Sequence, residues 1–155
     1  MTRNVPPPVA PDEAEAWYAP DVRAQYAVAS RVDATVREDE DGFVYEPRLP
    51  TLGPVADAAF RRVDDRLGAE IDRPRTREGI RERAADPPAD LRAALDREGL
   101  TPAARRRVRH HALAATHGAG MLTAVALDDR VDAVDGSGDR LVVHHESFSP
   151  ARTRL

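Results

Sequence analysis

Hydrophobic and polar residues alternate along two short stretches near the start of this chain. Residues 31–37 place Val32, Ala34 and Val36 on one side and polar residues on the other, and residues 43–46 alternate again after an acidic run. Two alternating stretches around an Asp-Gly pair, here Asp41-Gly42, predict a β-hairpin. Prolines at positions 47 and 50 end the second strand, because proline has no N–H to give to a sheet.

The spacing changes after this hairpin to the three- and four-residue steps of an α-helix. Residues 52–67 carry apolar side chains at this spacing, which predicts an amphipathic helix that ends at Gly68. Residues 75–98 are expected to be helical as well, with a break at the two prolines that follow Asp86. Asp86 is the expected N-cap of the second part, and its core face is expected to contain Leu91, Ala94 and Leu95.

A further helix is expected to begin at Thr101-Pro102, because threonine is a good N-cap and proline is tolerated in the first turn. It should run to about Thr116, with an apolar face formed by Val108, His111, Leu113 and Ala115. Gly118 and Gly120 then break the helix. A glycine after the last helical turn is typical of a helix C-cap followed by a tight turn.

The last segment combines a short helix with two alternating strands. The helix is expected to end at Asp128-Asp129, and the strands flank a Gly-Ser-Gly-Asp turn at residues 136–139. We expect strand 141–147 to lie at the edge of its sheet, where unpaired backbone groups favour dimerisation or pairing with another chain.

These elements predict an α+β fold, because strands and helices occupy separate parts of the chain rather than alternating. Residues 1–15 are rich in proline and are expected to be a disordered tail. Residues 16–50 should form the N-terminal strands, 51–117 a helical segment, and 118–155 the turn, short helix and second hairpin.

Composition limits the possible functions. All 23 basic residues are arginine, the chain contains no lysine, and its net charge is −4. An Asp-rich, lysine-free composition is typical of a salt-adapted cytoplasmic protein, and the net negative charge argues against nucleic-acid binding. The chain has no cysteine, no signal-like N-terminus and no apolar run long enough to cross a membrane, so we expect no disulfide and no direct membrane insertion.

No residue pattern predicts a catalytic, cofactor-binding or metal site. The neighbouring histidines His110 and His111 diverge on a helix, and His144 and His145 point to opposite faces of a strand, so neither pair chelates one ion. The acidic turns lack the register of a calcium loop, and no serine has a nucleophile context. An enzyme that uses His111 or His145 as a base is the least favoured alternative.

The segment from His117 onward resembles the region ahead of the motor domain in archaeal type II and type IV secretion ATPases, which drive pili and archaella. The resemblance lies in His117-Gly118-Ala119-Gly120, in Leu122 and Leu127, in residues 129–134, in Gly136 and in Leu141-Val142-Val143-His144. The tail Ser149-Pro150-Ala151-Arg152-Thr153 lies where the family often has a Gly-x-Leu-x-Thr-Asn ending. Tyr26-Ala27-Val28 and residues 42–47 resemble the family's N-terminal entry. Thr123-Ala124-Val125 and Val134-Asp135 depart from the family pattern.

This resemblance implies a non-catalytic, force-transmitting part of a secretion ATPase subunit, standing alone or split from its motor. In family members further strands and helices and then the motor follow, but a phosphate-binding loop needs a lysine that this chain lacks. The implied partners are a motor-bearing subunit or a membrane platform protein, and a homo-oligomer, at the inner face of the membrane. The expected interaction residues are Gly118, Gly120, Asp129, Val142 and His144. The alternative is an unrelated small α+β binding domain.

Overall fold

The computed structural model describes residues 21–29, 31–68, 73–74, 76–137 and 140–153. The expected tail at residues 1–15 lies outside them. The described residues form strands β1 (Val22–Ala29), β2 (Val32–Asp39), β3 (Gly42–Arg48), β4 (Val131–Ser137), β5 (Arg140–His145) and β6 (Ala151–Thr153), and helices α1 (Pro54–Leu67), α2 (Arg77–Ala85), α3 (Ala89–Asp96), α4 (Pro102–Thr116) and α5 (Leu122–Leu127). The fold is therefore α+β, as predicted. Its contacts divide it into a sheet unit, residues 1–49 and 128–155, and a helical unit, residues 50–127.

The predicted hairpin at residues 31–46 is confirmed as β2 and β3, which pair from Asp33 with Arg48 to Asp39 with Gly42. The tight turn between them is Glu40-Asp41, where the Asp41 N–H donates to the Asp39 carboxylate at 2.9 Å. Gly42 follows with a φ of 113°, which explains the glycine at this position. β1 pairs with the free side of β2 and extends the hairpin to three strands.

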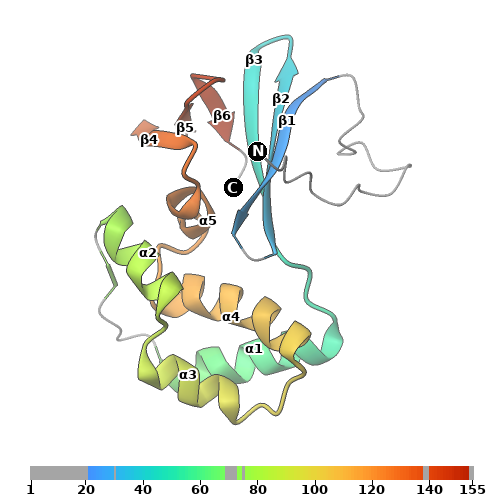
Figure 1. Cartoon of the computed structure of the whole chain (residues 1–155), viewed down its shortest axis with the longest axis vertical. Helices are drawn as coiled ribbons and strands as arrows, with labels where there is room; N and C mark the ends of the chain where they lie inside the picture. Colours follow the sequence, from blue (N-terminus) through green and yellow to red (C-terminus); the bar gives the residue numbers. More distant parts are fainter. Residues whose placement is uncertain (1–20, 30, 69–72, 75, 138–139, 154–155) are drawn as a thin grey trace. The chain divides into compact units, whose positions relative to one another are not determined.

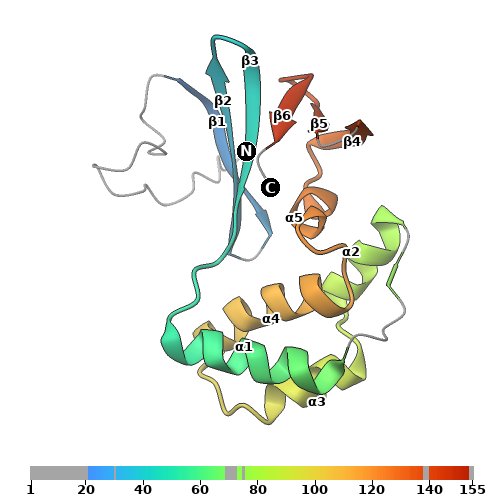
Figure 2. The same ribbon diagram turned by 180° about the vertical axis from the view of Figure 1, so that it is seen from behind.

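Strands from both ends of the chain form one sheet in the order β1-β2-β3-β6-β5-β4 (Figures 1 and 2). β6 joins the two parts: it pairs in parallel with β3 and antiparallel with β5. The expectation that strand 141–147 lies at an edge is therefore wrong, because β5 is paired on both sides and β4 forms the edge. Alternation along a strand identifies its two faces but contains no information about its neighbours.

One face of the sheet supplies the core of the sheet unit. The apolar residues on this inner face are buried: Val32, Ala34, Val36, Tyr26, Tyr45, Val131, Val143 and Ala151. The predicted alternation at residues 32, 34 and 36 is thus confirmed, and all three side chains are fully buried. The opposite or outer face carries Val44, Val142 and Arg152, which register places side by side on β3, β5 and β6.

The helical unit has its own core between α1, α3 and α4. Small and medium apolar side chains fill it: Ala56, Ala59, Val63, Leu91, Ala94, Leu95, Val108, Ala112 and Leu113. The predicted core residues of α3 are thereby confirmed. α2 packs against α5 in the same unit. None of the described helices is both long and apolar enough to cross a membrane.

Local signals explain where these helices begin and end. Gly68 follows α1 with a φ of 71°, and the Thr101 hydroxyl accepts the Ala104 N–H at the start of α4, as predicted. Two expectations were wrong. Asp86 caps the C-terminus of α2 while Pro88 precedes α3, and the buried histidine of α4 is His110 rather than His111. The two histidines lie at the border of the apolar face. Because adjacent helical side chains point about 100° apart, one of them faces the core and the other does not.

Arginine side chains from other elements bind carbonyl groups at helix C-termini in the helical unit. Arg77 and Arg81 both donate to the Ala126 carbonyl at the end of α5, at 3.0 and 3.1 Å. Arg73 donates to the Ala115 carbonyl in the last turn of α4 at 2.6 Å, and Arg109 donates to the Ala84 carbonyl in α2. A cation there satisfies free carbonyls and opposes the helix dipole.

Candidate functional site

A buried polar cluster in the sheet unit consists of Tyr26, Tyr45, Asp128 and His145. Both tyrosine hydroxyls donate to the same Asp128 oxygen, Oδ2, at 2.6 Å from Tyr26 and 2.7 Å from Tyr45. The other oxygen, Oδ1, accepts the Arg130 N–H at 2.9 Å. Asp128 is only 1% exposed, so these donors replace water around a buried carboxylate. We call this group the Asp128 cluster.

His145 completes the cluster, and its hydrogen bonds define its tautomer. The Ser147 N–H donates to His145 Nδ1 at 3.1 Å, so this nitrogen is the acceptor. Nε2 therefore carries the proton and donates to the Tyr26 hydroxyl at 2.9 Å. Burial lowers the pKa of His145, which favours this neutral form. The result is one chain of donors that runs from His145 through Tyr26 to Asp128.

The Asp128 cluster is suited to structure rather than to proton transfer. Burial, followed by the hydrogen bond to Asp128, raises the pKa of Tyr26, so the phenol keeps its proton at physiological pH. The Arg130 guanidinium lies 4.3 Å from the centre of the Tyr26 ring and covers it. A general base needs a pKa near the working pH, which a strongly raised tyrosine does not have. The cluster therefore holds residues 128–131 against β1 and β3.

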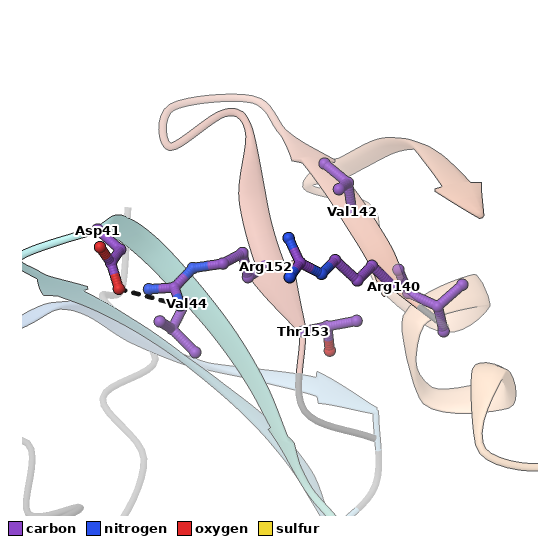
Figure 3. A pocket seen from close by; sticks show the side chains of 7 residues that line it. Asp41, Val44, Arg140, Val142, Arg152 and Thr153 are labelled. Carbon is purple, nitrogen blue, oxygen red and sulfur yellow. Dashed lines mark ion pairs between the residues drawn. The ribbon is translucent and has the colours of Figure 1, made fainter. Parts of the chain in front are cut away.

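The outer face of the sheet unit contains a pocket of about 620 Å³, a size that small-molecule sites commonly have. It is lined by Asp41, Val44, Arg140, Leu141, Val142, Arg152 and Thr153 (Figure 3). Arg140 extends from the start of β5 across the pocket toward β6, and Arg152 extends in the same direction from β6 toward Asp41. Cationic and apolar groups thus share one hollow.

Next to this pocket, His144 links three segments of the sheet unit. Its Nε2 lies 2.8 Å from the Asp135 carboxylate on β4, and its Nδ1 lies 3.1 Å from the Ser149 hydroxyl before β6. Ser149, His144 and Asp135 are the residue types of a catalytic nucleophile, base and orienting acid. However, the side chains of His144 and Asp135 are 37% and 76% exposed, and Ser149 is exposed too. In the catalytic triad the serine contacts Nε2 and the acid binds Nδ1, which is the reverse of this arrangement, so we interpret the group as a surface brace.

The structure places the sequence-predicted interaction residues in different surroundings. Val142 and His144 lie two positions apart on the outer face of β5, and Val142 lines the pocket. Asp129 is exposed in the turn before β4. Gly118 and Gly120 form the turn between α4 and α5 in the helical unit, where a Cβ on Gly118 would lie 2.6 Å from the Thr123 hydroxyl. Close packing explains Gly118, and the role of all five in partner binding stays a prediction.

Sequence reasoning missed the residues that the structure brings together most closely. It identified the Asp128-Asp129 pair but chose the exposed member, and it interpreted Asp135 as part of a turn. The partners of Asp128 are 102 and 83 residues away in Tyr26 and Tyr45, beyond the reach of any local pattern. The available signal was the inward position of both tyrosines on alternating strands. The prediction that His144 and His145 occupy opposite faces is confirmed.

Two of the other histidines, His111 and His117, bind polar groups of the protein. His111 bonds to the Pro50 carbonyl at 2.7 Å, and His117 contacts the Thr116 hydroxyl at 2.8 Å and the Asp90 carboxylate at 3.2 Å. In the part of the chain that the structure describes, no three His, Asp or Glu side chains are grouped so that they could hold a metal ion. Comparison with protein-family models and with curated protein sequences found no match for this chain.

Proposed function

We propose that this chain is a non-catalytic assembly or force-transmitting part of a secretion or type IV pilus ATPase subunit, acting alone or alongside a separate motor domain. One observation carries the proposal. Two of the segments that resemble the family, residues 42–47 and 149–153, are far apart in sequence but meet in one sheet. β3 and β6 pair with Phe43 opposite Ala151, Val44 opposite Arg152 and Tyr45 opposite Thr153.

Adjacent placement supports a shared origin of the two matching regions. Two fortuitous resemblances would have no reason to occupy neighbouring strands in register, whereas parts of one domain do. The helical unit is then an insertion between β3 and the segment that leads to β4. The Asp128 cluster holds the matching segment at residue 129 next to β1 and β3, which gives a rigid sheet for transmitting force.

The proposed contact surface is the outer face of β5 and the neighbouring β4 edge. Val142 and His144 lie on this face, and the exposed side chains of β4 include Asp132, Val134 and Asp135. An edge strand with one free side can pair with a strand of another chain. Its two aspartates disfavour pairing with an identical strand and favour a basic partner strand.

Co-purification with a motor-bearing secretion ATPase subunit, in molar KCl, tests this proposal. Val142→Asp, which places a charge on the proposed surface, should abolish capture, whereas Val55→Asp should not. Val55 is a matched control because it is 74% exposed on α1. ATP hydrolysis should be absent from the isolated chain and should change when the motor subunit is added. Strong hydrolysis by the isolated chain, or equal capture of both variants, contradicts the proposal.

The alternative is an unrelated small α+β binding domain, and the pocket on the outer face is the observation that favours it. The reading frame next to this gene distinguishes the two ideas. A frame that encodes the GxxxxGK[ST] phosphate-binding loop supports the secretion-ATPase proposal, since that loop supplies the lysine that this chain lacks. A chain that binds a small molecule but no motor subunit supports the alternative.

A further inference from the structure

A buried histidine at the end of β5 holds the loop that leads into β6. His145 is only 2% exposed, and residues 146–150 form this loop. The Ser147 N–H donates to His145 Nδ1 at 3.1 Å. The centre of the Phe148 ring lies 5.4 Å from that of the His145 ring and 5.3 Å from that of Phe43 on β3. His145 therefore holds the loop through a hydrogen bond and a ring contact, and we call His145, Ser147 and Phe148 the loop latch.

The loop latch fits only one protonation state of His145. A backbone N–H can only donate, so Nδ1 must present a lone pair to Ser147. On the other side of the ring, the Tyr26 hydroxyl donates its own proton to the Asp128 carboxylate at 2.6 Å, so it accepts the Nε2 proton at 2.9 Å. A second proton, on Nδ1, would place one donor against another and break the bond to Ser147. Protonation of His145 and closure of the loop therefore exclude each other.

The strand that depends on this loop is short. β6 has three residues and follows the loop directly, and it pairs on one side with β3 and on the other with β5. Beyond these ladders it is held by Arg152, whose Nη2 lies 2.7 Å from the Asp39 carboxylate. Both side chains of that pair are exposed, so the pair contributes little. Short elements with few contacts open locally before the rest of a fold, so loss of the loop latch should release β6 first.

The environment of His145 determines how acid acts on the loop latch. Burial has the largest effect and lowers the pKa of His145 below its ordinary value of 6.5. Three nearby carboxylates favour the protonated ring and one guanidinium disfavours it, namely Asp128, Glu146, Asp132 and Arg130. The aromatic groups that β1, β3 and the loop contribute carry no charge: Tyr26, Tyr45, Phe43 and Phe148. Because burial outweighs the carboxylates, the closed loop resists protonation, whereas an open loop exposes the ring to water.

We propose that His145 is an acid-sensitive latch that keeps β6 between β3 and β5. Above about pH 6.5 the neutral ring binds the Ser147 N–H and the loop stays closed. As the pH falls below about 6.5, the open loop binds a proton that the closed loop does not, so opening becomes more favourable. The effect reaches its limit at the lower pH at which the closed loop also binds the proton. Release of β6 exposes the backbone groups of β3 and β5 with which it pairs, and another strand can bind there. The latch acts whether or not the chain belongs to a secretion ATPase.

NMR of the ¹⁵N-labelled chain tests this proposal, at constant molar KCl. At pH 7, the His145 ring nitrogens should show a proton on Nε2 and none on Nδ1. Amide hydrogen exchange, corrected for the intrinsic rate at each pH, then measures opening. Protection of the Ser147 amide and of the amides of Ala151–Thr153 should fall about threefold to tenfold between pH 7 and pH 5.5. The amides of β2, which is paired on both sides, should stay better protected at both pH values.

Two variants separate His145 from its neighbour. His145→Gln keeps an N–H group that can donate to Tyr26 but cannot gain a proton, so the loss of protection between pH 7 and pH 5.5 should disappear. His144→Gln is the matched control, because it makes the same substitution at the adjacent residue. The His144 side chain is 37% exposed, and its Nδ1 contacts the Ser149 hydroxyl of the same loop at 3.1 Å. This variant should keep the acid response.

Several results overturn the proposal. They are a proton on Nδ1 at pH 7, no fall in protection in acid, an acid response that persists in His145→Gln or disappears in His144→Gln, and equal exchange of β6 and β2. If His145→Gln does not fold, the unsubstituted chain and His144→Gln decide. Loop opening must then increase over the pH range that begins below about 6.5 and ends where the His145 ring nitrogens titrate, and opening outside that range overturns the proposal.

Discussion

Replacing Asp128 with asparagine tests whether the buried cluster stabilises the sheet unit. The side chain keeps its size, but one oxygen becomes an NH₂ group and the charge is lost. In one orientation the amide faces the tyrosine hydroxyls, which now donate to Asp128 Oδ2 at 2.6 and 2.7 Å, and in the other it faces the Arg130 N–H. In both orientations a donor meets a donor, so no rotation of the side chain restores the network.

The expected loss follows from these hydrogen bonds. A hydrogen bond to a charged acceptor contributes about 1.5–3 kcal/mol, and the substitution weakens two of them. Partial recovery is expected at Tyr45, whose hydroxyl can turn to accept from the amide, so we expect Asp128→Asn to lower the free energy of unfolding by about 2–4 kcal/mol. Tyr45→Phe, which removes one donor and leaves the carboxylate with Tyr26 and the Arg130 N–H, should cost about 1.5–3 kcal/mol.

Urea unfolding followed by circular dichroism measures these changes, at constant salt. Asp129→Asn is the matched control, because it makes the same substitution at the neighbouring, exposed position and should cost less than about 1 kcal/mol. The double variant Tyr26→Phe with Tyr45→Phe should deviate from additivity, since both hydroxyls share one oxygen. Equal stability of the two asparagine variants would refute the structural role of the cluster.

Three other substitutions have expected outcomes. Burial lowers the pKa of His110 from 6.5 to about 4, so between these pH values the unfolded chain binds a proton that the folded chain does not. The free energy of unfolding should therefore fall by about 3 kcal/mol between neutral pH and pH 4. His110→Leu should remove this part of the pH dependence, as measured by urea titrations. The side chain of Glu98 is 3% exposed and pairs with Arg62 and Arg66, which water can reach. Glu98→Gln should therefore lower the free energy of unfolding by about 1–2 kcal/mol, and an unchanged free energy of unfolding contradicts this. Gly118→Ala, whose Cβ would meet the Thr123 hydroxyl at 2.6 Å, should lower the melting temperature and cost about 1–3 kcal/mol, whereas Gly53→Ala, with open space around it, should not.

Much of the secondary structure was predictable because its signals act within four residues. The Thr101 hydroxyl caps the Ala104 N–H three positions on, and Gly68 adopts a positive φ immediately after α1. The same reasoning failed at Asp86, where a good N-cap residue follows one helix as closely as it precedes the next. It also failed at His110, because two adjacent residues at the border of a helix face have nearly equal apolar spacing.

The candidate sites were less predictable because their parts come from distant strands. Arg140 and Arg152 line one pocket only because β6 pairs with β5 at Val142 and Val143. Likewise, Ser149 and Asp135 reach His144 from the segments on either side of β5. No spacing along the chain predicts these contacts. Among the residues of the pocket and the His144 group, the resemblance to secretion ATPases identified only Val142 and His144.

By itself, the sequence determined the α+β class, the helix boundaries set by capping residues, the alternation that buries Val32, Ala34 and Val36, and the absence of a lysine-dependent phosphate loop. Only the tertiary structure decided that β6 inserts between β3 and β5 and that Asp128 becomes buried. The physical reason is the separation along the chain of the groups that interact. Backbone propensity and capping depend on neighbouring residues, whereas strand order and the burial of a carboxylate depend on which distant hydrogen-bond donors are available to replace water.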